Sequence, residues 1–455
     1  MGIWHYIGAA LVLILITVVG MRAGKNVSSA DDFNSASHKA GAGVVMGSIA
    51  GTLVGGASTV GTAQLAFSYG LSAWWFTLGG GLACILLFLF FAKPLYESGF
   101  QTMPRILAHE FGQPSGMAAT LLTSAGSLLS IISQFLSGIA LIMTASALGS
   151  FAAAALITAL MLVYVVFGGV WGAGRVGIAK TALLCASVAV CGLIAVNTQG
   201  GLSAFRSLLP ADRYFNFFAR GYLTDGGAAL SIIVGVLTTQ SYIQAVISAR
   251  TLRLSRAGVL ASAVIIPFVG FAGILVGMYM KLNYPDIAPA SALPYFIMRH
   301  LPPLAAGAAL ATLLITVVGT GAGVALGLSS MIYNDIYKVF WGKAGGLFVS
   351  RLIIVIILVG SALLSSGNIG SLILGWSFLS MGLRGAVAFG PICAALFLRG
   401  MVPGKFALCS MIAGPAVVII SKIFIPGMDP LLPGVAANLA VICAGLAKKR
   451  LGNIS

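Results

Sequence analysis

Long apolar runs separated by short polar segments constrain the fold of this chain more than any other feature. Because a helix needs roughly 20 apolar residues to cross the hydrocarbon core of a bilayer, each run is long enough for about one span. The runs are continuous rather than alternating, which argues against a β-barrel. The sequence therefore predicts an all-α polytopic membrane protein with thirteen transmembrane helices, near residues 4–22, 43–68, 72–92, 117–149, 151–168, 178–197, 226–247, 257–280, 303–330, 346–365, 370–398, 404–424 and 431–447.

The composition excludes a water-soluble globule. Only 7% of the residues are charged and the mean hydropathy is +1.06, whereas soluble domains carry about 25% charged residues. The formal net charge of +16 could suggest a nucleic-acid partner. The basic residues lie in short loops, however, so they are better explained by the positive-inside rule and by contact with anionic lipid. We expect membrane lipid, and no nucleic acid, as a partner.

Lysine and arginine alternate between loops in a way that predicts the orientation. With the N-terminus outside, 17 basic residues fall on the cytoplasmic side and 6 on the outer side. The outer six are Arg206, Arg213, Arg220, Lys281, Arg299 and Lys422. This bias predicts an outer N-terminus and a cytoplasmic C-terminus, and we expect the chain to lie in a bacterial inner membrane.

The two remaining basic residues, Lys180 and Arg384, lie inside apolar runs, whereas all nine acidic residues lie in loops or at the ends of runs. No carboxylate is therefore expected at mid-membrane, which argues against a carboxylate proton relay and against a hydrolase with paired acids. The four histidines and six cysteines show no metal-ligand spacing. We expect neither an enzyme nor an organic cofactor.

Glycine clusters mark two of the runs. Gly51, Gly55, Gly56 and Gly61 surround Ser58 and Thr59 in one, and Gly319, Gly321 and Gly323 surround Thr320 in another. Such clusters loosen a helix and free backbone carbonyls, which transporters use to bind ions and substrate. Close helix packing through small residues explains the same pattern, so both interpretations stay open.

Several segments, in order along the chain, make it resemble the sodium:solute symporter family. They are Ser29-Ala30-Asp31-Asp32-Phe33, Ala66-Phe67-Ser68-Tyr69-Gly70-Leu71, Thr102-Met103-Pro104-Arg105, Tyr164-x-x-Phe167-Gly168-Gly169 and Leu328-Ser329-Ser330 followed by Asn334-Asp335-Ile336-Tyr337-Lys338. Each motif is moderately specific alone, and together they cover nearly the whole length.

The resemblance implies a LeuT-type fold in one transmembrane domain over 1–455. Two inverted repeats of five helices would occupy 43–197 and 226–398. One extra helix, 4–22, would precede them, and two more would follow within 404–447. The first helix of each repeat would be interrupted, with the binding site between the two breaks.

The resemblance also places a cation site. Backbone oxygens of Gly51 and Val54 and oxygens from Thr316, Gly319 and Thr320 would hold sodium, which is the one bound ion we expect. Gly319 stands where the family usually has serine, so one hydroxyl is missing. Gly177 and Lys180 stand where the family has aspartate and glutamine.

Lys180 has two interpretations. Its side chain could snorkel to the cytoplasmic interface, since the residue lies near the inner end of its run. Alternatively, its ammonium could reach the ion cavity and replace sodium, because a lysine in a low-dielectric site can exchange protons near neutral pH. The glycine at 319 leaves room for such a side chain.

The candidate substrate-binding residues are Ser58, Thr59, Gln240, Gln244 and Arg384. Ser58 and Thr59 could instead bond back to their own helix, and the glutamines could link helices. Arg384 could cap carbonyls at a helix break or attract an anion in the aqueous pathway.

These observations predict a secondary active transporter that moves a small organic solute by cation-coupled symport, with sodium as the family's usual ion. The solute should be neutral, zwitterionic or anionic, preferably a carboxylate, because the membrane interior offers cations but no anion. A proton-coupled or sodium-independent carrier using Lys180 is the main alternative, and a transmembrane solute sensor with a separate signalling partner is a rival. We expect the protein to act as a monomer.

Overall fold

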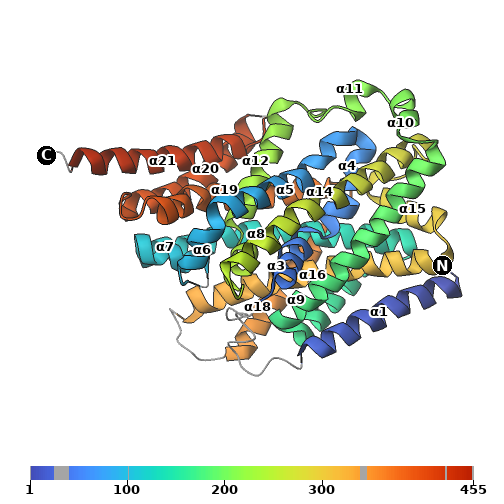
Figure 1. Ribbon diagram of the computed structural model, residues 1–455, viewed down its shortest axis with the longest axis horizontal. Helices are drawn as coiled ribbons and strands as arrows, with labels where there is room; N and C mark the ends of the chain where they lie inside the picture. Colours follow the sequence, from blue (N-terminus) through green and yellow to red (C-terminus); the bar gives the residue numbers. More distant parts are fainter. Residues whose placement is uncertain (1, 25–39, 101, 339–345, 426–427, 453–455) are drawn as a thin grey trace.

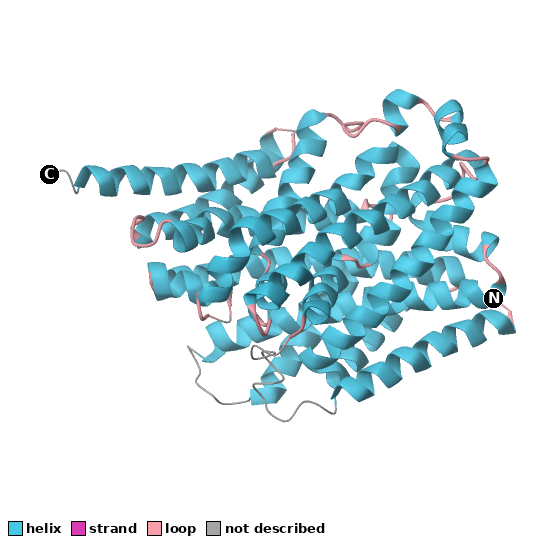
Figure 2. Cartoon of the chain, viewed as in Figure 1, coloured by secondary structure: helices cyan, strands magenta, loops and turns pink. Residues whose placement is uncertain are grey.

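The computed structural model describes residues 2–24, 40–100, 102–338, 346–425 and 428–452, without the side chains of 20–24, 165–176, 334–335 and 346–347. Within these residues the chain is helical and forms no strand, as Figure 2 shows; an isolated bridge joins Ala40 to Ala249. The all-α polytopic fold class is therefore confirmed. The Ser29–Phe33 motif lies outside the described residues.

The first half of the chain is built from long helices and short connecting helices (Figure 1). They are α1 (Ile3–Gly24), α3 (Ala42–Leu53), η1 (Ala57–Gly61), α4 (Thr62–Tyr69), η2 (Gly70–Trp74), α5 (Trp75–Leu86), η3 (Leu87–Phe91), α6 (Ala92–Glu97), α7 (Met103–Phe111), α8 (Gln113–Ala145), α9 (Ser150–Gln199), α10 (Leu202–Leu208) and α11 (Ala211–Tyr214).

The second half continues in the same manner. Its helices are α12 (Tyr222–Thr238), α13 (Gln240–Ile247), α14 (Leu252–Asn283), η4 (Pro289–Ser291), α15 (Ala292–His300), α16 (Pro303–Met331), η5 (Ile332–Tyr337), α18 (Gly346–Ser366), α19 (Ile373–Phe397), α20 (Gly404–Phe424) and α21 (Leu431–Gly452). The start of α1 and the end of α21 lie at opposite ends of the long axis (Figure 1).

Nine helices in the described part of the chain are long and apolar enough to cross a membrane, or ten if the bent pair of α12 and α13 forms one span. Shorter apolar helices cover 3–19, 42–53 and 150–164. The count of thirteen spans and the division into two repeats stay predictions.

The helix α9 covers two of the predicted runs, 151–168 and 178–197, without an interruption in its helical assignment. Tyr164 and Lys180 nevertheless both lie against Gly319 of α16. A straight helix would carry these two positions about 24 Å apart. Residues from both predicted runs of α9 therefore contact the same position of α16, and α9 is not straight between them.

Two helices are broken near the middle of the molecule. The helix α3 ends at Leu53, and after Val54–Gly56 the chain continues as the π-helix η1. This break lies inside the predicted glycine-rich stretch 51–61. The helices α12 and α13 meet at Thr239 with a bend of 46°. Both interruptions agree with the fold that the family resemblance implied.

The second glycine cluster does not break its helix. The helix α16 runs through Gly319–Gly323 without interruption. A Cβ on Gly321 would lie 2.4 Å from the Met161 methyl carbon. Gly321 therefore allows close packing against Met161, and the interpretation of this cluster as a helix break is wrong.

Glycine also sets the contact between α1 and α16. A Cβ on Gly307 would lie 1.9 Å from the carbonyl oxygen of His5, and one on Gly8 would lie 2.0 Å from that of Leu304. Such contacts let two backbones approach closely, which is how helices associate in lipid. The first helix is therefore docked through small residues.

We expect Gly307→Ala to destabilise the protein by about 1–3 kcal/mol, because the new methyl group overlaps the α1 backbone. Gly327→Ala, in the same helix, is the matched control, since nothing lies within 4 Å of its Cβ position. Thermal unfolding of the purified proteins in detergent compares them. Equal unfolding temperatures would contradict the docking of α1 through Gly307.

Candidate solute cavity and cation site

A small cavity lies between the two broken helices. The space open to the centre of a water molecule is about 20 Å³, which is room for about one water. Its wall is formed by residues from both breaks and from α5, α8, α16 and α19. They are Thr52, Leu53, Ala57, Phe76, Ser130, Gln134, Thr239, Ser241, Tyr242, Val324, Ser377, Met381 and Arg384.

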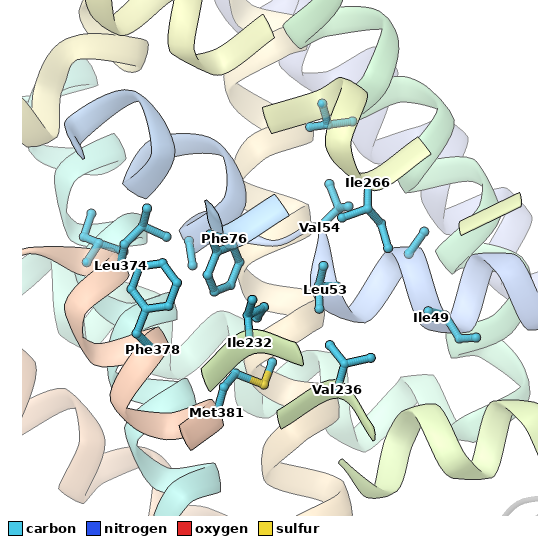
Figure 3. Close-up of a cluster of buried hydrophobic side chains, with 14 of the residues drawn as sticks. Ile49, Leu53, Val54, Phe76, Ile232, Val236, Ile266, Leu374, Phe378 and Met381 are labelled. Atoms are coloured by element: carbon cyan, nitrogen blue, oxygen red, sulfur yellow. The ribbon is translucent and has the colours of Figure 1, made fainter. Parts of the chain in front are cut away.

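One side of the cavity is apolar. Figure 3 shows Leu53, Phe76, Phe378 and Met381 within a cluster of buried side chains drawn from the helices around the breaks. The rings of Phe76 and Phe378 meet edge to face with centroids 5.5 Å apart. This side can cover the hydrocarbon part of a solute, while the polar groups of the lining come from the two breaks, α8 and α19.

Polar contacts lie next to Phe378, whose ring packs against Phe76 of the cavity wall. Arg220 lies over the Phe378 ring at 5.7 Å and forms an ion pair with Asp225 at 2.6 Å. The Ser72 hydroxyl donates to the same carboxylate at 2.8 Å. These contacts join the connection before α12 to η2 and α19.

A second polar contact joins α4 to the start of α19. The Gln64 amide donates to the Ser371 carbonyl oxygen at 3.1 Å, and its oxygen accepts from the Ile373 N–H at 2.9 Å. The side chain thereby ties α4 to the start of α19. Separation of α4 from α19 must break both hydrogen bonds.

The break after α3 is held by a side chain from α8. The Gly56 N–H donates to Gln134 Oε1 at 2.9 Å, and Gln134 is only 3% exposed. A freed N–H that is enclosed by protein at membrane depth needs a hydrogen-bond partner because the hydrocarbon offers none. Gln134 supplies that partner and faces the cavity at the same time.

The ammonium of Lys180 lies among the residues predicted to hold a cation. Lys180 Nζ donates to Thr320 Oγ1 at 3.2 Å, and the Thr320 hydroxyl donates to the Gly51 carbonyl oxygen at 3.3 Å. Lys180 is only 6% exposed. Its side chain therefore points into the protein, toward α3 and α16, and away from the interface.

Not all of the other residues predicted to bind the cation lie beside the Lys180 ammonium. A Cβ on Gly319 would lie 3.6 Å from Lys180 Nζ. Val54 ends α3, and its N–H bonds to the Ala50 carbonyl oxygen. The Thr316 hydroxyl donates to Thr312 in its own helix at 2.7 Å. The structure thus brings Gly51, Gly319 and Thr320 together around the ammonium.

Gly177 leaves no room for the aspartate that the family has at this position. Its Cβ would lie 2.8 Å from the Gly47 carbonyl oxygen, closer than real Cβ atoms approach. The loss of the side chain therefore lets α9 and α3 pack closely, beside the residues that contact Lys180.

Of the five predicted substrate-binding residues, only Arg384 lines the cavity. Ser58 and Thr59 donate to the Gly55 carbonyl oxygen of their own helix, at 3.0 and 2.9 Å. Gln240 accepts from the Met103 N–H at 2.8 Å. Gln244 lies one turn further along α13, away from the lining residues.

Sequence reasoning missed Gln134 and Tyr242. Gln134 carried a usable signal, because a polar amide in the long apolar run 117–149 must find a partner inside the bundle. Tyr242 carried none, because a tyrosine near the end of a run is equally typical of a membrane interface. Its position after the bend at Thr239 places it at the cavity.

These features define a class of protein: a polytopic helical membrane protein with two broken helices around a central cavity. A sequence profile of the sodium:solute symporter family matches residues 35–414. The chain therefore belongs to the sodium:solute symporter family. That family consists of cation-coupled secondary transporters and not of enzymes.

Among curated proteins, the chain is 33% identical over 154 residues to the uncharacterized symporter YwcA of Bacillus subtilis (strain 168). The matched region spans 33% of this chain and 30% of that relative.

Two solved structures share the fold over nearly the whole length. One is the substrate-bound, outward-open state of a Na⁺-coupled sialic acid symporter, with a TM-score of 0.79 and 18% identity over 99% of this chain and 98% of the other. The other is the inward-facing conformation of Mhp1, with a TM-score of 0.61 and 14% identity over 94% and 95%. The LeuT-type fold is thereby confirmed.

We expect Gln134→Leu to cost about 1–3 kcal/mol of stability, because it leaves the Gly56 N–H buried without a partner. Gln199→Leu removes an exposed amide that contacts Asn283 and should change stability by less than about 0.5 kcal/mol. Thermal unfolding in detergent compares the two variants. Wild-type stability of Gln134→Leu would show that the break does not need this hydrogen bond.

Proposed function

We propose that this protein is a secondary carrier that moves a small organic solute across the membrane by alternating access. The observation that carries the proposal is the cavity between the two broken helices, lined by polar groups from both breaks. Transporters of this design bind their substrate near the midplane at such breaks. Uptake of labelled solutes into proteoliposomes tests the proposal, with protein-free liposomes as the control.

The charge of the cavity favours a carboxylate solute over a cation. Arg384 lines the cavity and is 5% exposed, and no described acidic residue forms an ion pair with it. A cationic solute would meet uncompensated repulsion in a low dielectric. Neutral and zwitterionic solutes remain compatible with this site, whereas a simple amine cation does not.

The position of Lys180 supports a carrier in which the ammonium takes the place of the coupling sodium ion. Its Nζ lies within hydrogen-bonding distance of Thr320 Oγ1, and its Cε lies beside Gly51. A sodium ion about 4 Å from this charge would be repelled by about 4 kcal/mol at an effective dielectric near 20. Weak or absent sodium dependence follows, together with transport that changes with pH.

Sodium coupling is the second candidate, and the remaining oxygens favour it. The Gly51 carbonyl and the Thr320 hydroxyl already face one another, and sodium is bound by neutral oxygens in this family. If Lys180 moves away during the transport cycle, these oxygens could hold sodium in a weakened site. The two candidates differ in what the removal of the ammonium should do.

We expect Lys180→Ala to abolish the pH dependence of transport or to open the site to sodium. The double variant Lys180→Ala/Gly319→Ser should show the stronger sodium activation, because it restores the missing hydroxyl and removes the competing charge. Uptake into proteoliposomes with imposed sodium or proton gradients measures both effects. Steep sodium activation in the wild type that Lys180→Ala leaves unchanged would exclude the lysine mechanism.

The charge bias of the loops supports an orientation with the N-terminus outside and the C-terminus in the cytoplasm of a bacterial cell. Arg250, Arg253 and Arg256 lie in and after the connection between α13 and α14, and this orientation places them inside.

We expect a cysteine introduced at Arg253, in a variant lacking the exposed Cys409 and Cys443, to react with a membrane-impermeant maleimide only after the cells are permeabilised. A cysteine at Arg206, in α10, should react in intact cells and serves as the matched control. The reverse pattern would overturn the orientation.

A further inference from the structure

Two buried polar side chains, one from the half-helix α13 and one from α19, line the same cavity. Tyr242 lies in the first turn of α13, directly after the bend, and is 1% exposed. Arg384 lies in α19 and is 5% exposed.

Each of these two side chains has one donor atom without a protein partner in the described structure, Nη1 of Arg384 and Oη of Tyr242. Arg384 Nε donates to the Ser380 carbonyl oxygen at 3.2 Å, and Nη2 lies 2.9 Å from Ser380 Oγ and 3.2 Å from the Met381 sulfur. Arg384 Nη1 and Tyr242 Oη have no hydrogen-bond partner among the described residues. Both side chains line the cavity, so these donors are available to a group bound there.

Other polar groups near the cavity form their hydrogen bonds and ion pairs with different partners. Gln134 Oε1 accepts from the Gly56 N–H. The Thr239 hydroxyl donates to the Gly235 carbonyl oxygen at 2.5 Å. The Asp225 carboxylate forms its ion pair with Arg220 and not with Arg384. The cavity therefore presents a positive charge and a free hydroxyl without an anion between them.

We propose that Arg384 Nη1 and Tyr242 Oη together form the seat for the carboxylate of the transported solute. Each carboxylate oxygen accepts hydrogen bonds, and charge-assisted bonds to a guanidinium and a phenol hold such a group in a fixed orientation. The inference rests on the proposed carboxylate transport and adds Tyr242 as a residue that determines specificity.

The seat also gives the solute a structural role. Tyr242 belongs to the half-helix α13, whereas Arg384 belongs to the unbroken α19. A carboxylate bound to both joins the broken helix to α19. A neutral isostere leaves the guanidinium unpaired and cannot make this link, which is how a site discriminates through a charged group.

The test uses the purified full-length protein and thermal unfolding in detergent, so that binding is measured apart from transport. The probes are propionate, lactate, pyruvate and benzoate, with propionamide as the neutral isostere of propionate and nitrate as a simple planar anion. We expect at least one carboxylate to raise the unfolding temperature saturably, and propionamide and nitrate to have no such effect.

Two variants separate the seat from a structural role. Tyr242→Phe should weaken carboxylate binding by about tenfold or more, because a hydrogen bond to a charged group is lost. Arg384→Met should abolish the carboxylate response and yet unfold at or above the wild-type temperature, since it removes a buried unpaired charge. Tyr279→Phe, at a buried tyrosine away from the cavity lining, is the control and should bind like the wild type.

The outcomes are distinct. If no carboxylate stabilises the wild type, the proposed solute class and the seat are both overturned. If a carboxylate binds equally well to the wild type and to Tyr242→Phe, the carboxylate class stands and the two-donor seat is wrong. If nitrate stabilises as strongly as the carboxylates, the site is a simple anion site. A marked loss of stability in Arg384→Met without ligand would assign Arg384 to packing within α19.

Discussion

Backbone hydrogen bonding without water is the constraint on which the rest of this structure depends. In a bilayer, a helix can be interrupted only where protein groups replace its lost partners. At Gly56 that group is the Gln134 side chain. The interruption therefore lies where a polar side chain from α8 can reach it, and this requirement places a polar cavity among helices that are otherwise apolar.

The two cations buried within spans lie at different places around the α3 break. Lys180 contacts Thr320 beside Gly51, before the break, whereas Arg384 faces the cavity that Thr52 and Ala57 line. Each is surrounded by neutral groups in the described structure. Because like charges repel strongly in a low dielectric, this separation is compatible with the two roles proposed above, Lys180 at the ion position and Arg384 at the solute position.

Small residues make these positions possible. Gly319 has no side chain to fill the space beside Lys180 Nζ, and Gly177 allows α9 to approach the backbone of α3 at Gly47. A serine and an aspartate at these two positions would build the family's sodium site. The chain instead has two glycines at these positions and a buried lysine, which is the basis for the proposed replacement of sodium by the ammonium.

The sequence by itself determined the helical membrane class, the family and the position of the first break, because apolar length, motif order and clustered glycines are local properties of the chain. It also singled out Lys180 and Arg384, since a charge inside an apolar run is visible without a structure. It left open where each charge points. It could not decide between a helix break and close packing at Gly319–Gly323. It also suggested a substrate role for Ser58, Thr59 and Gln240, whose side chains form hydrogen bonds within the protein in the structure. Only the tertiary structure decided where Lys180 and Arg384 lie and that α16 continues through Gly319–Gly323, because the direction of a side chain and the partner of a freed N–H depend on residues far away in the chain, such as Gln134 for Gly56.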